Sequence, residues 1–127
     1  MVTGGAGFIG SNIVEGLVKR GDRVRVLDNL MYGQEPLFHL CAHPQFDFVR
    51  GDVRDEGLLR RLIADADILL PLAAIVGAGA CERDPWLAQA VNRDAVCLLN
   101  RLRSPRQLVV YPVTNSGYGT KSGEVHC

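Results

Sequence analysis

Short apolar runs alternate along this 127-residue chain with longer stretches whose apolar residues recur every three or four positions. The short runs, rich in β-branched residues, predict strands at 1–3, 24–27, 46–49, 68–74 and 107–111. The periodic stretches predict helices at 8–20, 55–63 and 85–103, and 35–43 is weakly helical. Strands that alternate with helices are typical of a parallel sheet. Right-handed crossovers then predict an α/β fold that is doubly wound in three layers, with strand order 3-2-1-4-5.

Polar and special residues mark where the predicted helices begin and end. Gly21 stands where a glycine would end the helix over 8–20. Asp55 is placed to cap the next helix, and Asp84 followed by Pro85 is a typical start for the last one. These signals support the number and the limits of the helices.

Two details of the pattern bear on packing. Ile9, Ile13 and Leu17 form one apolar stripe with Val14 and Val18 beside it, which predicts that this side of the first helix faces the sheet. The fourth strand is apolar throughout, so we expect it to be buried on both faces. Pro71 lies inside that strand and removes one donor from its ladder of hydrogen bonds.

Composition and charge exclude several classes of protein. The chain is 47% hydrophobic and 22% charged, and its 14 basic and 14 acidic side chains give no net charge. Its length favours one domain with a real core and argues against disorder. With no basic cluster and few aromatic residues, we expect no nucleic-acid partner. No apolar run approaches the roughly 20 residues that span a bilayer, so we expect no membrane partner.

The cysteines and histidines give little sign of a metal or a disulfide framework. Four cysteines are widely spaced, without a CxxC pair: Cys41, Cys81, Cys97 and Cys127. Without a signal-peptide pattern they predict reduced thiols in a cytoplasmic protein. His39 and His43 would share one face of a helix, but Cys41 would point away from it. A surface helix explains this segment better than a metal site does, so we expect no metal.

A glycine-rich turn between the first strand and the first helix predicts a nucleotide site. Gly4, Gly7 and Gly10 have the spacing GxxGxxG. The first glycine permits a tight turn, the second lets the backbone approach a pyrophosphate, and the third lets the helix pack closely on the strand. The phosphates would then lie at a positive helix N-terminus. This arrangement indicates a Rossmann-type dinucleotide site, and the alternative is a tight turn without a ligand.

Acidic residues follow the second and third predicted strands. Asp28 lies 24 residues after Gly4, where a carboxylate accepts hydrogen bonds from ribose hydroxyls and repels a 2′-phosphate. It therefore favours NAD over NADP, the alternative being an acidic turn residue. Asp52 is suited to the amino group of adenine, the alternative being an aspartate that caps a helix.

These residues converge on one edge of the predicted sheet. The fourth strand ends in small side chains that would let a dinucleotide lie against the backbone, although an ordinary core would look the same. Gly4, Asp28, Asp52, Ala74 and Thr114 all stand at the carboxyl ends of successive strands. In open α/β sheets, ligands bind at that edge.

In its glycine-rich turn and in the residues at its strand ends, the chain resembles the extended short-chain dehydrogenase/reductases, specifically the NAD-dependent sugar-nucleotide epimerases and dehydratases. Residues 3–11 read TGGAGFIGS, the fingerprint of that family, and 28–30, 51–55 and 72–74 are similar to its next three cofactor segments. Asn92 resembles the family's asparagine near the nicotinamide. The cofactor-binding residues that the resemblance implies are Gly4, Gly7, Phe8, Ile9, Gly10, Asp28, Asn29, Asp52, Val53, Leu72, Ala73, Ala74 and Asn92.

The resemblance also implies an activity. In that family NAD takes a hydride from a nucleotide sugar and later returns it, and a Ser or Thr hydroxyl that corresponds to Thr114 binds the reacting oxygen. The family's catalytic YxxxK motif would lie beyond Cys127, and the spacing from Tyr118 to Lys121 is one residue too short for it.

We therefore expect residues 1–127 to form an incomplete NAD-binding domain, inactive alone, that lacks the substrate-binding part. Members of that family often form homodimers through two helices, of which one corresponds to the helix starting at Pro85 and the other to the absent part, so the resemblance leaves dimerisation of this chain open. The alternative is a non-catalytic dinucleotide-binding module that senses redox state or docks to a partner.

Overall fold

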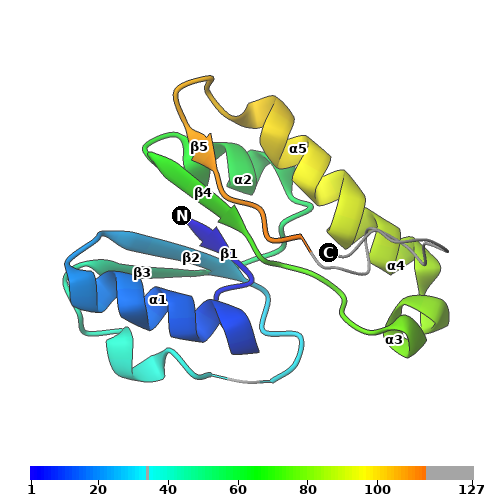
Figure 1. Cartoon of the computed structure of the whole chain (residues 1–127), viewed down its shortest axis with the longest axis horizontal. Coiled ribbons are helices and arrows are strands. Elements are labelled where there is room, and N and C mark those ends of the chain that lie inside the picture. Colours follow the sequence, from blue (N-terminus) through cyan, green and yellow to red (C-terminus); the bar gives the residue numbers. More distant parts are fainter. Residues whose placement is uncertain (34, 114–127) are drawn as a thin grey trace, which may run out of the picture.

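The computed structural model describes residues 1–33 and 35–113, in which a five-stranded sheet lies between two layers of helices (Figure 1). The strands are β1 (Val2–Thr3), β2 (Val24–Asp28), β3 (Phe46–Arg50), β4 (Ile68–Pro71) and β5 (Leu108–Val109). The helices are α1 (Phe8–Arg20), α2 (Glu56–Ile63), α3 (Ala78–Arg83), α4 (Pro85–Gln89) and α5 (Ala95–Leu102). Two shorter segments are the 3₁₀ turn η1 (Phe38–Leu40) and the π-helical segment η2 (Ala90–Asp94). The sheet order is β3-β2-β1-β4-β5 with parallel pairing throughout, which confirms the predicted fold class and strand order.

An apolar core fills each side of the sheet. On one side, Val14 and Val18 of α1 pack with valines of β1 and β2. On the other side, leucines and isoleucines of α2 and α5 pack with Leu27 and Leu69. Helix α1 therefore covers one face, while α2 and α5 cover the other (Figure 1). Because Val26 and Leu27 belong to opposite cores, β2 is buried on both faces, as expected for a parallel sheet.

The buried side of α1 centres on Val14 and Val18, beside the predicted stripe, and Leu17 packs against the same core. The buried residues of the helix are Gly10, Val14 and Val18, whereas Ile9 is 65% exposed. The cause lies at Gly10, where an added Cβ would stand only 2.8 Å from the Cα of Gly5. This close approach turns the Gly10 side of the helix toward the sheet and leaves Ile9 at the surface.

The predicted helix ends are confirmed. Gly21 ends α1 with a left-handed φ of 95°, and its N–H donates to the carbonyl of Val18 at 3.0 Å. Asp55 accepts the N–H of Leu58 at 2.9 Å, and Asp84 accepts that of Leu87 at 2.9 Å. The alternative for Asp52, that it caps a helix, is therefore wrong for α2.

Several predicted elements are longer than those that the structure contains. The segment 35–43 contains only the short turn η1, in which no residue is buried, so it lacks a helix's apolar stripe. The strand predicted at 107–111 is limited to Leu108–Val109. Conversely, α3 was not predicted, since Gly77 and Gly79 argue against a helix there and none of its residues is buried.

Pro71 explains why β4 pairs only briefly with β5, and β4 ends at Pro71, short of the predicted 74, opposite the end of β1 at Thr3. The N–H groups of Leu70 and Leu72 donate to the carbonyls of Met1 and Thr3 in β1, at 2.9 and 3.0 Å. By alternation the nitrogen of Pro71 faces β5, to which it has no hydrogen to donate. Pairing between β4 and β5 accordingly ends at Leu69 and Val109, while pairing with the central strand continues.

A buried glutamine joins α2 to the loop before β5. The Nε2 atom of Gln107 donates to the carbonyl of Ile63, the last residue of α2, at 2.5 Å and to that of Ala66, beyond the helix, at 2.6 Å. Its Oε1 accepts the N–H of Ser104 at 2.7 Å. These bonds satisfy polar groups at a helix end that lies against the core. Across the described ranges, no helix has the length and apolar character needed to cross a membrane.

Candidate functional site

The loop between β1 and α1 shows why glycine is required at its first position. Gly4 has a φ of +68°, a left-handed conformation that side chains disfavour. A Cβ added there would lie 2.5 Å from the amide nitrogen of Ala73, in the segment that follows β4. The N–H of Gly4 donates to Leu27 in β2 at 2.9 Å. The loop therefore meets the ends of both neighbouring strands at the carboxyl edge of the sheet.

Among the residues that the structure describes, no side chain caps the N-terminus of α1, which is open. Gly7 precedes the helix without a side-chain cap, and the first turn contains no acidic residue. Ser11 makes the first intrahelical bond, to the carbonyl of Gly7 at 2.9 Å, so the N–H groups of residues 8–10 have no acceptor within the helix. Phe8 and Ile9 beside them are 86% and 65% exposed. Such an end attracts an anion through its free N–H groups and its helix dipole.

Asp28 lies beside this loop and is bonded to it. One carboxylate oxygen, Oδ2, accepts the N–H of Ala6 at 2.9 Å, and Oδ1 accepts that of Leu30 at 2.8 Å. The predicted alternative, an acidic turn residue, thus describes part of its role, since Leu30 adopts a left-handed φ of 57° in that turn. Each carboxylate oxygen has capacity for a second donor. Asn29, next along, is exposed, and its Oδ1 accepts the N–H of Met31 at 3.0 Å.

Asp52 follows β3 and is held by an arginine that sequence reasoning did not single out. Arg54 Nε donates to Asp52 Oδ1 at 2.9 Å, and Nη2 donates to Oδ2 at 2.6 Å. The hydrogen bond from the Arg54 guanidinium holds the pKa of Asp52 below its usual value, partly opposed by burial and assisted by the amide of Asn29. Asp52 is therefore a fixed, ionised acceptor at the carboxyl edge.

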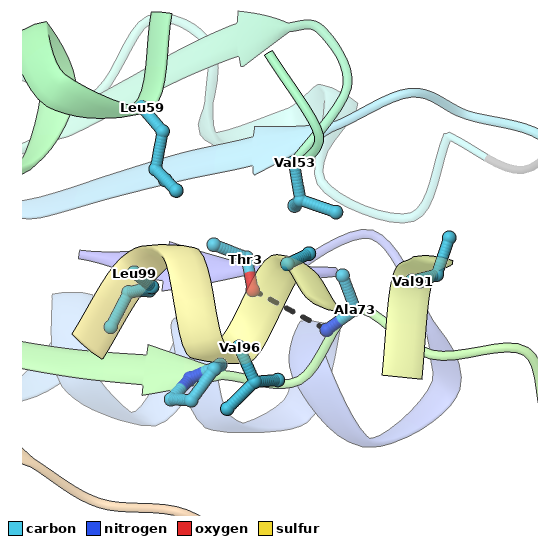
Figure 2. Close-up of a pocket in the computed structure, with 9 residues that line it drawn as sticks. Thr3, Val53, Leu59, Ala73, Val91, Val96 and Leu99 are labelled. Carbon is cyan, nitrogen blue, oxygen red and sulfur yellow. Dashed lines mark hydrogen bonds between the residues drawn. The ribbon is translucent and has the colours of Figure 1, made fainter. Parts of the chain in front are cut away.

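Val53 differs from its neighbours because its side chain points into the core. It is 9% exposed and lines a cavity of about 10 Å³ with Thr3, Leu59, Ala73 and Val91, among others (Figure 2). This apolar space holds at most about one water molecule, so it is not a ligand pocket. Any contact between Val53 and a ligand at the edge falls to its main chain.

The segment after β4 approaches the glycine loop from the other side. The N–H of Ala73 donates to the hydroxyl of Thr3 at 3.4 Å, drawn as the dashed line in Figure 2. Leu72 and Ala73 are half-buried, whereas Ala74 is exposed. The small side chains of Ala73 and Ala74 leave the backbone open beside Gly4.

Asn92 is bonded to this same segment. Its Oδ1 accepts the N–H of Ile75 at 2.8 Å, and its Nδ2 donates to the carbonyl of Ile75 at 3.0 Å. Asn92 lies in η2, where the long predicted helix changes to π-helical hydrogen bonding. Segments of this kind are frequent at functional sites. The repeat of apolar residues passes through η2 unchanged, so no periodicity signal could have located it.

The fifth expected position, Thr114, lies outside the described residues. The structure brings together Gly4, Asp28, Asp52 and Ala74 at one edge, each after a different strand. Within residues 1–33 and 35–113, no three His, Cys, Asp or Glu side chains gather where they could hold a metal ion. His39, one of the residues weighed as a ligand, instead lies with its Nε2 3.3 Å from Glu15.

Comparison with known proteins places this edge in context. The model of the NAD dependent epimerase/dehydratase family matches residues 1–125. A dTDP-glucose 4,6-dehydratase of Actinoplanes sp. is 36% identical over 132 residues, which cover 94% of this chain and 41% of the relative.

Solved structures agree with this similarity. A double mutant of dTDP-glucose 4,6-dehydratase from Streptomyces venezuelae, solved with NAD bound, superposes with a TM-score of 0.85 at 32% identity, covering 97% of this chain and 41% of that one. UDP-glucose 4-epimerase from Thermotoga maritima gives a TM-score of 0.82 at 25% identity, covering 97% and 40%. The chain thus spans about two fifths of the length of these relatives.

Proposed function

The chain belongs to the NAD-dependent epimerase/dehydratase family, and from this premise we propose that it is the cofactor-binding part of an enzyme that transforms a nucleotide sugar by transient hydride transfer. One observation carries the proposal: the open N-terminus of α1 faces an edge where a glycine loop and two carboxylates meet. That edge offers a positive end for phosphates and acceptors for sugar and base.

The residues at the edge fit NAD on physical grounds. The pyrophosphate would accept hydrogen bonds from the free N–H groups of Phe8, Ile9 and Gly10. Gly7 would allow this close approach, because a Cβ at this position would stand between the pyrophosphate and the backbone. Asp28 would accept the adenosine ribose hydroxyls with its remaining lone pairs, helped by Asn29. Together these contacts would lay the cofactor across the ends of β1 and β2.

The adenine and the nicotinamide would lie on either side of the ends of β1 and β2. Asp52 would accept the amino group of adenine beside the main chain of Val53. The nicotinamide half would run along Leu72, Ala73 and Ala74 toward the segment that Asn92 holds. Asp28 disfavours a 2′-phosphate by charge, so the proposed cofactor is NAD and not NADP.

The chemistry divides between cofactor and protein. When bound, NAD supplies a reversible hydride acceptor. The described residues bind and orient it, and the hydroxyl of Thr114 would donate a hydrogen bond to the reacting sugar oxygen. The proposal also includes a nucleotide sugar as the substrate, one domain formed by residues 1–127, and a cytoplasmic location. It further includes a homodimer through the helical stretch from Pro85, where Trp86 is 82% exposed.

Two measurements test the proposal against the alternative of a non-catalytic dinucleotide-binding module. Calorimetric titration should show saturable binding of NAD that is tighter than that of NADP, and absence of NAD binding would contradict both ideas. Turnover of nucleotide sugars by the family-length protein, reduced by Thr114→Val and retained by Thr114→Ser, would support the enzyme. A family-length protein that binds NAD but never reduces it on any nucleotide sugar would favour the module.

A further inference from the structure

Arg54 forms a bidentate ion pair with Asp52 just after β3, a more specific geometry than that of a single-contact surface pair. Its Nε and Nη2 reach the two carboxylate oxygens side by side, at 2.9 and 2.6 Å. Its own main-chain N–H adds a third bond, to Oδ1 at 2.9 Å. A planar guanidinium in this fork fixes both the position and the plane of the carboxylate. Asp52 therefore has one orientation at the carboxyl edge.

The surroundings keep both partners charged. The pKa of Arg54 is raised chiefly by its hydrogen bond to Asp52, with a further contribution from the charge of Asp84. The side chains of Asp52 and Arg54 are 31% and 46% exposed, so the pair is reachable from solvent without being fully hydrated. An ionised carboxylate can accept hydrogen bonds but cannot donate one.

The bonds already made determine what Asp52 can still accept. Among the described residues, Oδ1 accepts two hydrogen bonds from Arg54, which occupy its two lone pairs, and Oδ2 accepts one, from Nη2, while the amide of Asn29 approaches the carboxylate more loosely. One acceptor position of fixed direction remains on Oδ2. The 6-amino group of adenine would donate to it, but the 6-oxo group of hypoxanthine would place a second acceptor against a carboxylate.

We infer that Arg54 is a positioning residue that makes this site selective for a 6-aminopurine over a 6-oxopurine, by fixing Asp52 for the base. The inference rests on the proposed function, because it takes Asp52 to face the adenine half of NAD. Orientation and charge make separate contributions. The charge of Asp52 attracts the amino group in any orientation. Without Arg54 the carboxylate would be free to rotate away from the base, and a water molecule would then donate to the 6-oxo group. The 6-oxopurine would no longer be disfavoured.

The experiment compares the dissociation constants of NAD and of nicotinamide hypoxanthine dinucleotide, its 6-oxo analogue. The wild type should bind NAD more tightly by roughly tenfold or more, the value of one hydrogen bond to a charged group. In Arg54→Met this ratio should fall toward one, and Arg54→Lys, which keeps the charge without the fork, should lie between. Arg60→Met is the matched control, because Arg60 pairs with Glu56 on α2 at 2.7 Å, away from Asp52, and should leave the ratio unchanged.

The outcomes separate the two proposals. A folded Arg54→Met protein that keeps the wild-type ratio overturns the inference, while its NAD binding leaves the proposed function intact. Equal affinity of the wild type for both dinucleotides likewise overturns the inference alone. If the ratio is lost in Asp52→Asn but not in Arg54→Met, Asp52 reads the base without help and Arg54 has no such role. A wild type that binds neither dinucleotide contradicts the proposed function itself. Urea unfolding of each variant shows that the fold is kept.

Discussion

The carboxylate of Asp28 accepts the N–H of Ala6 at 2.9 Å, so the residue proposed to select the cofactor also holds the loop proposed to bind its phosphates. The two residues are 22 positions apart and belong to different turns at the carboxyl edge. A change at Asp28 therefore alters two things at once: the charge near the ribose and the support of the glycine loop.

Two substitutions at Asp28 should separate these effects. Asp28→Asn keeps an oxygen for the N–H of Ala6 but removes the charge and turns an amide NH2 toward the N–H of Leu30, so the preference for NAD over NADP should shrink by roughly tenfold with a smaller loss of NAD affinity than in the alanine variant. Asp28→Ala removes both, so NAD affinity itself should fall further. Calorimetry with NAD and NADP measures the ratio. Equal losses in the two variants would show that the bond to Ala6 contributes nothing to binding.

Gly7→Val should abolish dinucleotide binding in a folded protein. The φ of Gly7 is −75°, which valine adopts freely, and an added Cβ would lie 3.3 Å from the carbonyl of Gly4. The larger part of the side chain would then occupy the space where a phosphate approaches the backbone. We expect NAD affinity to fall more than about tenfold, the loss of one charged hydrogen bond.

The matched control for that loss is Gly16→Val, on the same helix. A Cβ at Gly16 meets no atom of residues 1–33 and 35–113 within 4 Å. This variant should keep both NAD affinity and the urea midpoint of the wild type. Comparable losses in the two variants would mean that the effect comes from α1 as a whole and not from the phosphate position.

Much of the fold was predictable because burial leaves a period in the sequence. The runs that became β2 and β3 and the repeat Leu59–Ile63 in α2 follow directly from the two faces of a parallel sheet. Once the strands are known, the carboxyl edge and its residues follow from topology. Glycine and aspartate at that edge could therefore be proposed as a site before any coordinates.

The remaining details depend on contacts between distant segments. The glycine spacing predicts that α1 packs closely on the sheet at Gly10, but the apolar stripe does not show that this contact leaves Ile9 at the surface. The break at Pro71 depends on which neighbour its nitrogen faces, a question of strand order and register. The bond from Arg54 to Asp52 joins residues two apart, but only the turn after β3 brings the guanidinium back onto the carboxylate.

Gln107→Ala should destabilise the fold without changing NAD affinity. The substitution leaves the carbonyls of Ile63 and Ala66 and the N–H of Ser104 without their partner in a site where Gln107 is 9% exposed. Unpaired buried groups of this kind cost roughly 2–3 kcal/mol in the free energy of unfolding, measured by urea titration. Gln89→Ala, at an exposed position of α4, should change it little. A wild-type midpoint for Gln107→Ala would contradict the role of this glutamine.

Arg25 gives the structure a dependence on acid pH. It donates to Asp47 at 2.8 Å, to Asp65 at 2.6 Å and to the carbonyl of Leu62 at 3.0 Å, joining β2, β3 and the end of α2. Its hydrogen bond, and then its charge, lower the pKa of Asp65. The stabilisation is thus complete above the pKa of an unfolded aspartate and is lost as the pH falls through the lowered folded value.

Arg25→Met should accordingly raise the pKa of Asp65, as followed by NMR titration of its carboxyl carbon. The variant should also lose less stability than the wild type between neutral pH and the acid range, because part of the acid-sensitive contribution is already gone. Arg101→Met, at an exposed position of α5, is the control, because the groups whose charges act on Asp65 include Arg23 but not Arg101. An unchanged titration of Asp65 in Arg25→Met would show that the ion pair does not persist in solution.

The first effect of replacing Asn92 should be a more mobile segment after β4. The amide of Asn92 makes both bonds to the main chain of Ile75, a residue that is 7% exposed, and these bonds connect η2 to the segment that carries Ala73 and Ala74. Asn92→Ala removes the acceptor and the donor together. The N–H of Ile75 should then exchange with solvent faster, by roughly tenfold or more, as expected when a hydrogen bond of this strength is lost.

Asn92→Asp separates the two bonds, because a carboxylate still accepts the N–H of Ile75 but has nothing to donate to its carbonyl. Protection of the Ile75 amide should therefore be restored in this variant. If Asn92 acts by holding the segment, NAD affinity in the two variants should follow that protection, with the larger loss in Asn92→Ala. Full protection of Ile75 in Asn92→Ala would show that other contacts hold the segment, and loss of NAD affinity despite full protection would point to a direct contact between Asn92 and the cofactor.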